Sequence, residues 1–301
     1  MSAVDALTQQ PQQTPPVVEA VGRRRRIRRL RSLPLQAKIG IAILTVLFLA
    51  GIFAPLIAPY GQNEINFTEI FQPPSLTHLF GTDGAGRDVF SRTLYALRLD
   101  LAIVLFVTYI PLPIGVLVGA VAGFYGGWVD DLLMRITEAF QTVPNFILLL
   151  VLVAVFGSEL NVITIAIGLV GWTAPCRLVR AEFLSLRSRE FVLAARGLGM
   201  RDAQLILGEV LPNALPPVIV YASVVMAVAI LLESALAFLG LSDPNIASWG
   251  NMIGAGRSVL RTEWYVSAIP GAAVLVTVLA FSLVGQGLND ALNPRLQVHQ
   301  A

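Results

Sequence analysis

Few residues in this sequence have the type and spacing that a chemical site requires. The two histidines, His78 and His299, have no partner at a spacing that suits a metal ion. The single cysteine, Cys176, excludes an intrachain disulfide and a cysteine metal cluster, and we expect it to be a small buried residue. No nucleophile has a base at a convincing spacing. The sequence therefore predicts neither a catalytic site nor a metal site, and an enzyme is a weak hypothesis.

Two other kinds of chemistry would let a protein draw on a source of energy. A nucleotide-binding P-loop needs a lysine after a glycine-rich turn, but the only lysine is Lys38, in the sequence LQAKIG. An ion-coupled carrier keeps ionisable residues inside its membrane helices. The one candidate of that kind is Glu233, which we expect to be a local hydrogen-bonding group and retain as a candidate pathway residue. Near the cytoplasmic entry of the apolar segment 139–157, charged residues occur only at Asp130, Asp131, Arg135 and Glu138.

The composition is that of a membrane protein. Hydrophobic residues make up 55% of the 301 residues, charged residues make up 13%, and the mean hydropathy is +0.72. Soluble domains carry about 25% charged residues. A helix that spans a bilayer needs about 20 mostly apolar residues. Six segments qualify: 39–57, 101–129, 139–157, 160–176, 214–232 (extending toward 239) and 268–288.

The distribution of cations predicts the orientation of these spans. Six crossings place both termini on one side of the membrane. Sixteen of the 21 cations, including the run RRRRIRRLR at Arg23–Arg31, then fall on the same side as the amino terminus. Because cytoplasmic segments carry the excess of Lys and Arg, we expect both termini to be cytoplasmic. The basic run can also contact anionic lipid head groups.

The stretch EFVLAARGLGMRDAQLILGEVLPN, residues 190–213, lies on the same side and is predicted to form two helices around a glycine. Apolar residues recur at helical spacing at Phe191, Ala194, Ala195 and Leu198. Gly199 follows, where a helix often ends in a left-handed residue. Asp202 then begins a second helix, whose apolar stripe is Leu205, Ile206 and Val210.

Two interpretations of this stretch are open. The small side chains of Ala194 and Ala195 leave a shallow surface that another protein could approach, with Arg196 beside them as a charged contact. The alternative is an amphipathic loop that only connects two spans.

The part LAARGLGMRDAQLILGEVLPN resembles the EAA loop of permeases from binding-protein-dependent ABC importers. Ala194, Ala195, Gly199, Leu211 and Pro212 match the motif. The position of the motif glutamate holds Leu193, which removes any polar contact of that glutamate but keeps the helix–turn–helix shape. The resemblance implies contacts with an ATPase through Phe191, Leu193, Ala194, Ala195, Arg196, Gly199, Leu211 and Pro212.

Three further matches narrow the family. HLFGTDGAGRDVFSRTLYALRLDL, residues 78–101, is similar to the outer-loop signature of the second permease of dipeptide, oligopeptide and nickel importers. The matching residues are Gly81, Thr82, Asp83, Gly86, Arg87, Asp88, Ser91 and Arg92. The segments 234–253 and 279–296 also match, although Gln286, Asn289 and Asn293 replace charged residues that are common in relatives. Together the four matches cover about residues 35–296 in the expected order.

The resemblance implies a fold and a set of partners. The fold is that of an all-α polytopic membrane protein with six transmembrane helices and a MetI-like permease core. The expected partners are a homologous second permease, one or two ABC ATPases, an extracytoplasmic solute-binding protein and membrane lipid, with no nucleic acid. ATP and magnesium would bind to the ATPases, and this chain would carry no cofactor. The runner-up hypothesis is a secondary transporter or channel.

The predicted organisation follows from these matches. A disordered basic tail covers residues 1–36 and the first span residues 37–59. An extracytoplasmic loop or cap covers residues 60–100. A five-helix core covers residues 101–290, with a cytoplasmic coupling loop at 178–213, and a short tail covers residues 291–301. The resemblance implies the inner membrane of a prokaryote, and the cargo cannot be identified from the sequence.

Overall fold

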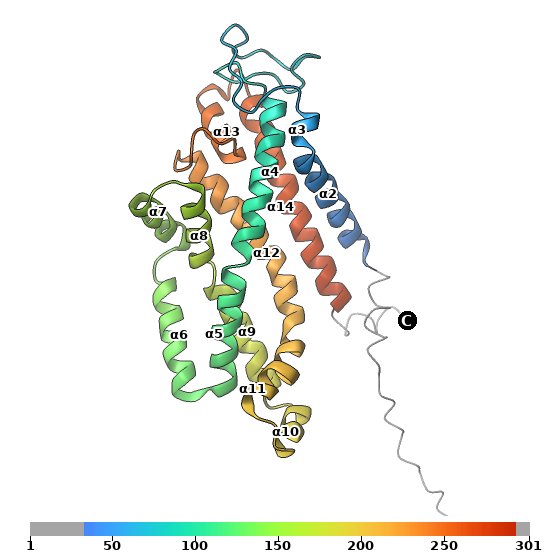
Figure 1. Cartoon of the computed structure of the whole chain (residues 1–301), viewed down its shortest axis with the longest axis vertical. Helices are drawn as coiled ribbons and strands as arrows, with labels where there is room; N and C mark the ends of the chain where they lie inside the picture. The colour runs from blue at the N-terminus through green and yellow to red at the C-terminus, as the bar shows by residue number, and fades with distance from the viewer. Residues whose placement is uncertain (1–32, 293–301) are drawn as a thin grey trace, which may run out of the picture. The chain divides into compact units, whose positions relative to one another are not determined.

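The computed structural model describes residues 33–292, and its main unit begins at Pro34. The predicted basic tail with Arg23–Arg31, most of the predicted carboxyl-terminal tail and His299 lie outside the described residues. Within the described part the chain is helical, with one isolated β-bridge between Thr82 and Asp88. Figure 1 shows the helices running side by side between a loop-rich end and the end that carries α10.

Most helices follow one another along the chain with short connections, except that a long loop separates α3 from α4. They are α2 (Leu35–Ile52), α3 (Ala54–Ile57), α4 (Val89–Thr108), α5 (Pro111–Tyr125), α6 (Gly127–Gln141), α7 (Asn145–Phe156), α8 (Leu160–Val170), α9 (Thr173–Leu186), α10 (Glu190–Gly197), α11 (Asp202–Gln204), η2 (Leu205–Val210), α12 (Leu211–Phe238), α13 (Trp249–Gly256), η3 (Arg257–Val259) and α14 (Tyr265–Leu292).

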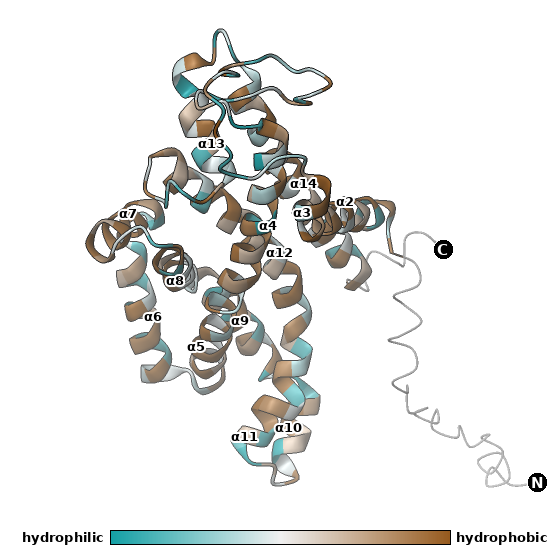
Figure 2. Cartoon of the chain, turned by 45° about the horizontal axis from the view of Figure 1, so that its top comes forward, coloured by the Kyte–Doolittle hydropathy of each residue, from teal (hydrophilic) through white to brown (hydrophobic). Residues whose placement is uncertain are grey.

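Five of the six predicted spans are confirmed as single helical stretches, and the sixth corresponds to a bent pair of helices. Five helical stretches are long and apolar enough to cross a membrane: Leu35–Ile52, Val89–Tyr125, Leu160–Leu186, Asp202–Phe238 and Tyr265–Leu292. The sixth is the pair α6 and α7, which is bent by 75° at a short break. Figure 2 shows these helices as mainly hydrophobic, whereas hydrophilic residues gather in the loops at the two ends.

Two predicted boundaries are wrong. The second span begins at Val89 rather than at residue 101, because the side chain of Asp88 caps the helix and no proline or glycine interrupts it before Pro111. The third span was predicted to start at residue 139, but α6 already begins at Gly127. Hydropathy did not identify α6 as part of a span because the helix carries several charged residues. The kink predicted near Pro144 does lie at the bend between α6 and α7.

The interior consists of two hydrophobic clusters, one toward each end of the bundle. The larger one packs α4, α12, α13 and α14 around the fully buried Trp249. The smaller one joins α5, α9, α10, η2 and α12 through Phe124, Phe183, Val192, Leu205 and Val210. Large apolar side chains also remain exposed on α2, α7, α12 and α14, which suits helices that contact lipid or another apolar partner.

Close approach of α5 and α9 depends on a row of glycines. Gly115, Gly119 and Gly123 lie four residues apart on the face of α5 that contacts α9. A Cβ atom on Gly123 would lie 2.6 Å from Cβ of Phe183, and one on Gly115 would lie 2.9 Å from the backbone of α9. Small residues at this spacing let helix backbones approach closely in membranes.

Candidate functional site

The predicted helix–glycine–helix stretch is present at the end of the bundle opposite the loop-rich end (Figure 1). Helix α10 ends at Gly197, and Gly199 has a φ of +86°, as predicted. The amide of Gly199 donates to the carbonyl of Arg196, and that of Met200 donates to the carbonyl of Ala195. These two bonds form a Schellman motif, which satisfies carbonyls at the helix end.

Helix α10 buries one face and exposes the other. Val192 is 1% exposed and packs into the smaller hydrophobic cluster, with Ala195 beside it. On the other side, Phe191 is 42% exposed, Leu193 is 53% exposed, and Ala194 is exposed as well. The predicted stripe of Phe191, Ala194, Ala195 and Leu198 therefore describes mostly the exposed face, whereas Val192 anchors the helix.

Arg196 contacts its own chain. Its guanidinium lies 3.5 Å from the carboxylate of Asp202 and 5.4 Å from the ring centre of Phe124 in α5. The ion pair is half exposed and contributes little by itself. The two contacts nevertheless tie α10 to the helix that follows and to the end of α5, so Arg196 also orients α10.

The second predicted helix is not a separate element. From Asp202 the chain continues through α11 and η2 into α12 without a break, as one helical stretch to Phe238. Leu205 and Val210 are buried and Ile206 is partly buried, as the predicted stripe requires. Leu211 and Pro212 form the first turn of α12. Helix α10 is therefore joined to this membrane-spanning stretch both by the short link at residues 198–201 and by packing in the smaller hydrophobic cluster.

The outer loop, residues 58–88, folds onto the other end of the bundle. Two signature glycines have left-handed backbones, with φ of +76° at Gly81 and +71° at Gly86. A Cβ on Gly86 would overlap the carbonyl of Asn66, so the chain can pass only because this residue is glycine. The hydroxyl of Tyr265 donates to the carbonyl of Gln72, which fixes the loop to α14.

The charged signature residues hold this loop together. Asp83 accepts hydrogen bonds from the amides of Ala85 and Arg87 and forms a 2.8 Å contact with the Arg87 side chain. Arg92 is 3% exposed and donates to the carbonyl of Gln62 across the loop. The hydroxyl of Thr82 donates to the carbonyl of Glu69. The predicted fold of the loop thus rests on its signature, although the loop ends at Asp88 and not at residue 100.

Asp88 joins the loop to the start of α4. One carboxylate oxygen accepts from the amide of Ser91 at 2.7 Å, and the other lies 2.9 Å from Nδ1 of His78. Ser91 in turn accepts from the amide of Tyr60. Both His78 and Asp88 are buried. The role of His78 was not predicted from the sequence, because its partner lies ten residues away in an irregular loop, where spacing does not indicate contact.

Replacement of Asp88 by alanine is expected to loosen the loop. The change removes a helix cap, which costs roughly 0.5–2 kcal/mol, and leaves buried His78 without its partner, which costs roughly 1–3 kcal/mol more. Limited proteolysis within residues 60–88 of purified protein should become much faster. Glu64→Ala, at an exposed position of the same loop, is the control. Equal cleavage rates in Asp88→Ala and the control would contradict this assignment.

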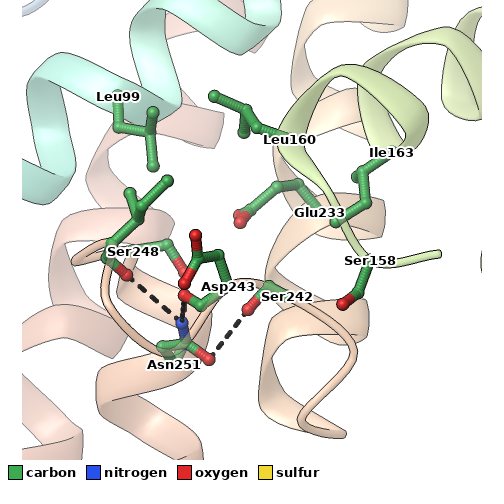
Figure 3. A pocket seen from close by; sticks show the side chains of 10 residues that line it. Leu99, Ser158, Leu160, Ile163, Glu233, Ser242, Asp243, Ser248 and Asn251 are labelled. Carbon is green, nitrogen blue, oxygen red and sulfur yellow. Dashed lines mark hydrogen bonds between the residues drawn. The ribbon is translucent and has the colours of Figure 1, made fainter.

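Glu233 occupies a tight polar site near the outer loop. It lies in α12, is 4% exposed and lines a cavity of only about 10 Å³ with Ser242, Ser248 and Asn251 (Figure 3). Its carboxylate accepts from the hydroxyl of Ser234 at 3.4 Å. This environment agrees with a local hydrogen-bonding role, and its place on a transport pathway stays a prediction.

A second buried carboxylate, Asp100 of α4, contacts the start of α13 next to Ser248, which lines the Glu233 cavity. Asp100 is 2% exposed and accepts from the amide of Trp249 at 3.4 Å, while its other oxygen has no hydrogen-bond partner among the described residues. The sequence analysis assigned Asp100 to the outer loop and expected no ionisable residue in the second span, which is wrong. The uninterrupted helical sequence after Asp88 was the signal that could have placed it in α4.

The described residues contain no group of three or more potential metal ligands. Cys176 is fully buried between α5 and α9, as predicted for a small apolar residue. No arrangement of nucleophile, base and cavity suggests catalysis in the described part. The features that require an explanation are therefore the exposed face of α10 and the folded outer loop.

Comparisons with known proteins cover α10 and the beginning of the outer loop. The family model described as binding-protein-dependent transport system inner membrane component matches residues 115–298. A second model, described as the N-terminal TM domain of oligopeptide transport permease C, matches residues 24–74. The first match includes α10 and most of the helices, and the second includes the first span and the beginning of the outer loop.

Individual relatives are similar over most of their length. A Brucella suis (biovar 1) protein that is named as a peptide permease is 41% identical, over 86% of this chain and 87% of its own. The dipeptide transport system permease protein DppC of Alkalihalophilus pseudofirmus is 38% identical over 87% and 86% of the two chains. The oligopeptide transport system permease protein OppC of Bacillus subtilis is 36% identical over 87% and 86%.

The fold itself also has a solved counterpart. A structure of the MetNI methionine ABC transporter, in an inward-facing conformation, matches with a TM-score of 0.53 at 17% identity. The match covers 68% of this chain and 96% of the other. At this identity the likeness concerns the arrangement of the helices alone.

Proposed function

Because this chain belongs to the family of binding-protein-dependent transport system inner membrane components, it is a multi-pass permease subunit of an ABC importer, and we propose that its cargo is short peptides. The relatives that are 36–41% identical over most of both chains carry peptide, dipeptide or oligopeptide permease names, which supports this cargo class. The chain forms part of the passage, and the energy comes from separate subunits.

The observation that carries the coupling proposal is the geometry of α10. This helix exposes Phe191, Leu193 and Ala194 at the end of the bundle while Val192 fixes it to the packed interior. A partner that holds the exposed face therefore moves α9 and α12 together with it. The absence of a P-loop in the sequence suits ATPases that bind ATP and magnesium themselves and contact the permease here.

The orientation follows from the same proposal. The end that carries α10 faces the cytoplasm, where the ATPases are, and the excess of arginines on that side agrees with the positive-inside rule. The outer loop then faces the extracytoplasmic space. Its fold, fixed by Asp83, Asp88 and Arg92, offers a rigid surface to a solute-binding protein that delivers the cargo.

A homologous second permease completes the passage. One copy of this chain has exposed apolar residues along α7 and α12, among them Val155, Phe156 and Val224, and these faces require a cover within the complex. We expect the protein to be unstable or aggregated when it is produced alone and solubilised gently. Production together with a homologous second permease and ABC ATPases from the same organism should give a single complex by size-exclusion chromatography.

Two results would contradict different parts of this proposal. A monodisperse monomer that takes up peptide without any partner would contradict the proposed assembly. A stable complex with a different cargo would retain the permease assignment and contradict only the peptide class. Mass spectrometry of small molecules released from the co-purified binding protein distinguishes these cases.

A further inference from the structure

Helices α6 and α9 lie in the half of the bundle that carries α10 (Figure 1). Residues of these two helices line a charged cleft. Its volume is about 720 Å³, and it is open at the surface. The lining residues are Asp131, Met134, Arg135 and Glu138 from α6, with Arg177 and Arg180 from α9. Neither the α10 contact nor the outer loop accounts for it.

The charges in this cleft are balanced. Arg180 is held by Asp130 through two hydrogen bonds of 2.5 and 2.6 Å. Among the described residues, the other four charged side chains that line the cleft have no oppositely charged group within 4.0 Å; they are Arg135, Arg177, Asp131 and Glu138. Two free cations and two free anions therefore face the same space. A purely anionic ligand would be attracted by the arginines but repelled by the carboxylates. A ligand with one positive and one negative group can pair each of them with a side chain of opposite charge.

The cleft is a water-facing surface and not a lipid-facing one. Asp131, Arg135 and Glu138 recur at intervals of four and three residues, which places them on one face of α6. The exposed apolar residues of α6 form another face: Trp128, Leu132, Ile136 and Phe140. From Asp131 to Glu138 the charges extend about 10 Å along the helix. Charged groups at such positions in membrane proteins face the bundle interior or an aqueous cavity.

A second, separate cavity is lined in part by the amino-terminal end of α9. Ala174, one turn before Arg177, lines an apolar cavity of about 90 Å³ together with Tyr221 and Val224 of α12. Asn145, at the start of α7, lines it too, directly after the break that ends α6. Along α9 the apolar cavity at Ala174 and the charged cleft at Arg177 and Arg180 therefore border successive turns, with the charged cleft nearer the α10 end.

From this arrangement we propose that the α6–α9 cleft binds the two charged ends of a short peptide as it leaves the passage. Arg135 and Arg177 contact its carboxylate, and Asp131 and Glu138 contact its ammonium group. The inference rests on the proposed peptide cargo. It adds a binding surface that responds to the termini, which every unmodified peptide has, and not to the side chains.

The test measures aqueous access to the cleft in the complete importer, reconstituted in lipid nanodiscs. Met134→Cys, in a Cys176→Ala background, should react rapidly with a charged methanethiosulfonate. Ile136→Cys, on the apolar face of the same helix, is the matched control and should react at least about tenfold more slowly. Dialanine should protect Met134→Cys, and N-acetyl-dialanine amide, which lacks both charges, should not.

Substitution of the cleft charges should weaken this protection. Glu138→Gln and Arg177→Gln should each raise the dialanine concentration for half-protection by about tenfold, as expected for loss of one charged hydrogen bond. Glu182→Gln, on α9 but outside the cleft, should leave it unchanged. Slow labelling of Met134→Cys would overturn the proposal, and so would equal protection by the capped analogue. Labelling that is fast in detergent but slow in nanodiscs would also overturn it, because that result assigns the cleft to a phospholipid head group.

Failure of the cleft and failure of the peptide cargo are separable in the same preparation. If the importer accumulates dialanine with ATP but dialanine gives no protection, the cleft proposal is wrong and the proposed function stands. If the importer accumulates no peptide although its binding protein stimulates ATP hydrolysis, the peptide cargo is wrong.

Discussion

Ala194→Trp is expected to abolish peptide uptake while the complex still reaches the membrane. Ala194 is exposed on α10 next to Leu193, so an indole at this position occupies the space where a partner must lie. Blocking the centre of such a contact costs roughly 2–4 kcal/mol, which corresponds to a loss of about 30-fold to 1,000-fold in ATPase association. Uptake and the ATP hydrolysis that the binding protein stimulates should be lost together.

The matched control for this variant is Ala181→Trp, an exposed alanine on the preceding helix α9. Both variants should pair normally with the second permease, because neither side chain lies in the packed interior. Pull-down of the ATPases, measured beside stimulated hydrolysis, separates loss of docking from loss of folding. Normal docking and stimulation in Ala194→Trp would mean that residues 190–213 only connect two spans.

Gly119→Leu is expected to prevent stable folding. A Cβ at this position would lie 2.9 Å from Cβ of Val179 and 3.0 Å from the amide nitrogen of Arg180, and it would overlap the carbonyl of Cys176. Most of these atoms belong to the backbone of α9, so the two helices must separate to accept the side chain. Overpacking of this kind costs roughly 3 kcal/mol or more, and the protein should fall to a small fraction of its normal level in the membrane.

The control for the glycine prediction lies on α14. Gly271 is also in a helix, but no atom lies within 4 Å of the position its Cβ would take. Gly271→Leu should therefore accumulate to the normal level, and the comparison separates helix packing from a general intolerance of leucine for glycine. Equal levels of both variants by quantitative immunoblot would contradict the close α5–α9 packing.

The apolar segments could be predicted from the sequence because hydropathy is a local property. The six spans, the left-handed Gly199 and the burial of Leu205 and Val210 all follow from patterns within a few residues. The start of α6 could not be found in this way, since Asp131, Arg135 and Glu138 make that helix resemble a loop. The charged residues of α6 line a cleft with arginines of α9, which lies about 40 residues later in the chain, so their role is visible only in the folded protein.

The outer loop was also only partly predictable from the sequence. Its signature residues were identified by resemblance, and the structure gives each a physical task, such as the cap that Asp88 provides for α4. The contact of Asp88 with His78 and that of Asp100 with the amide of Trp249 depend on how separate segments fold together. No spacing in the sequence encodes those contacts.

Uptake by the purified complex in proteoliposomes tests the central claim most directly. With the binding protein and labelled dipeptide on the outer-loop side and ATP on the α10 side, accumulation should require ATP. It should also persist when protonophores and ionophores remove every ion gradient. Accumulation that follows an imposed proton or sodium gradient in the absence of ATP and ATPases would contradict this account and favour a secondary transporter, with Asp100 and Glu233 as its first candidate coupling residues.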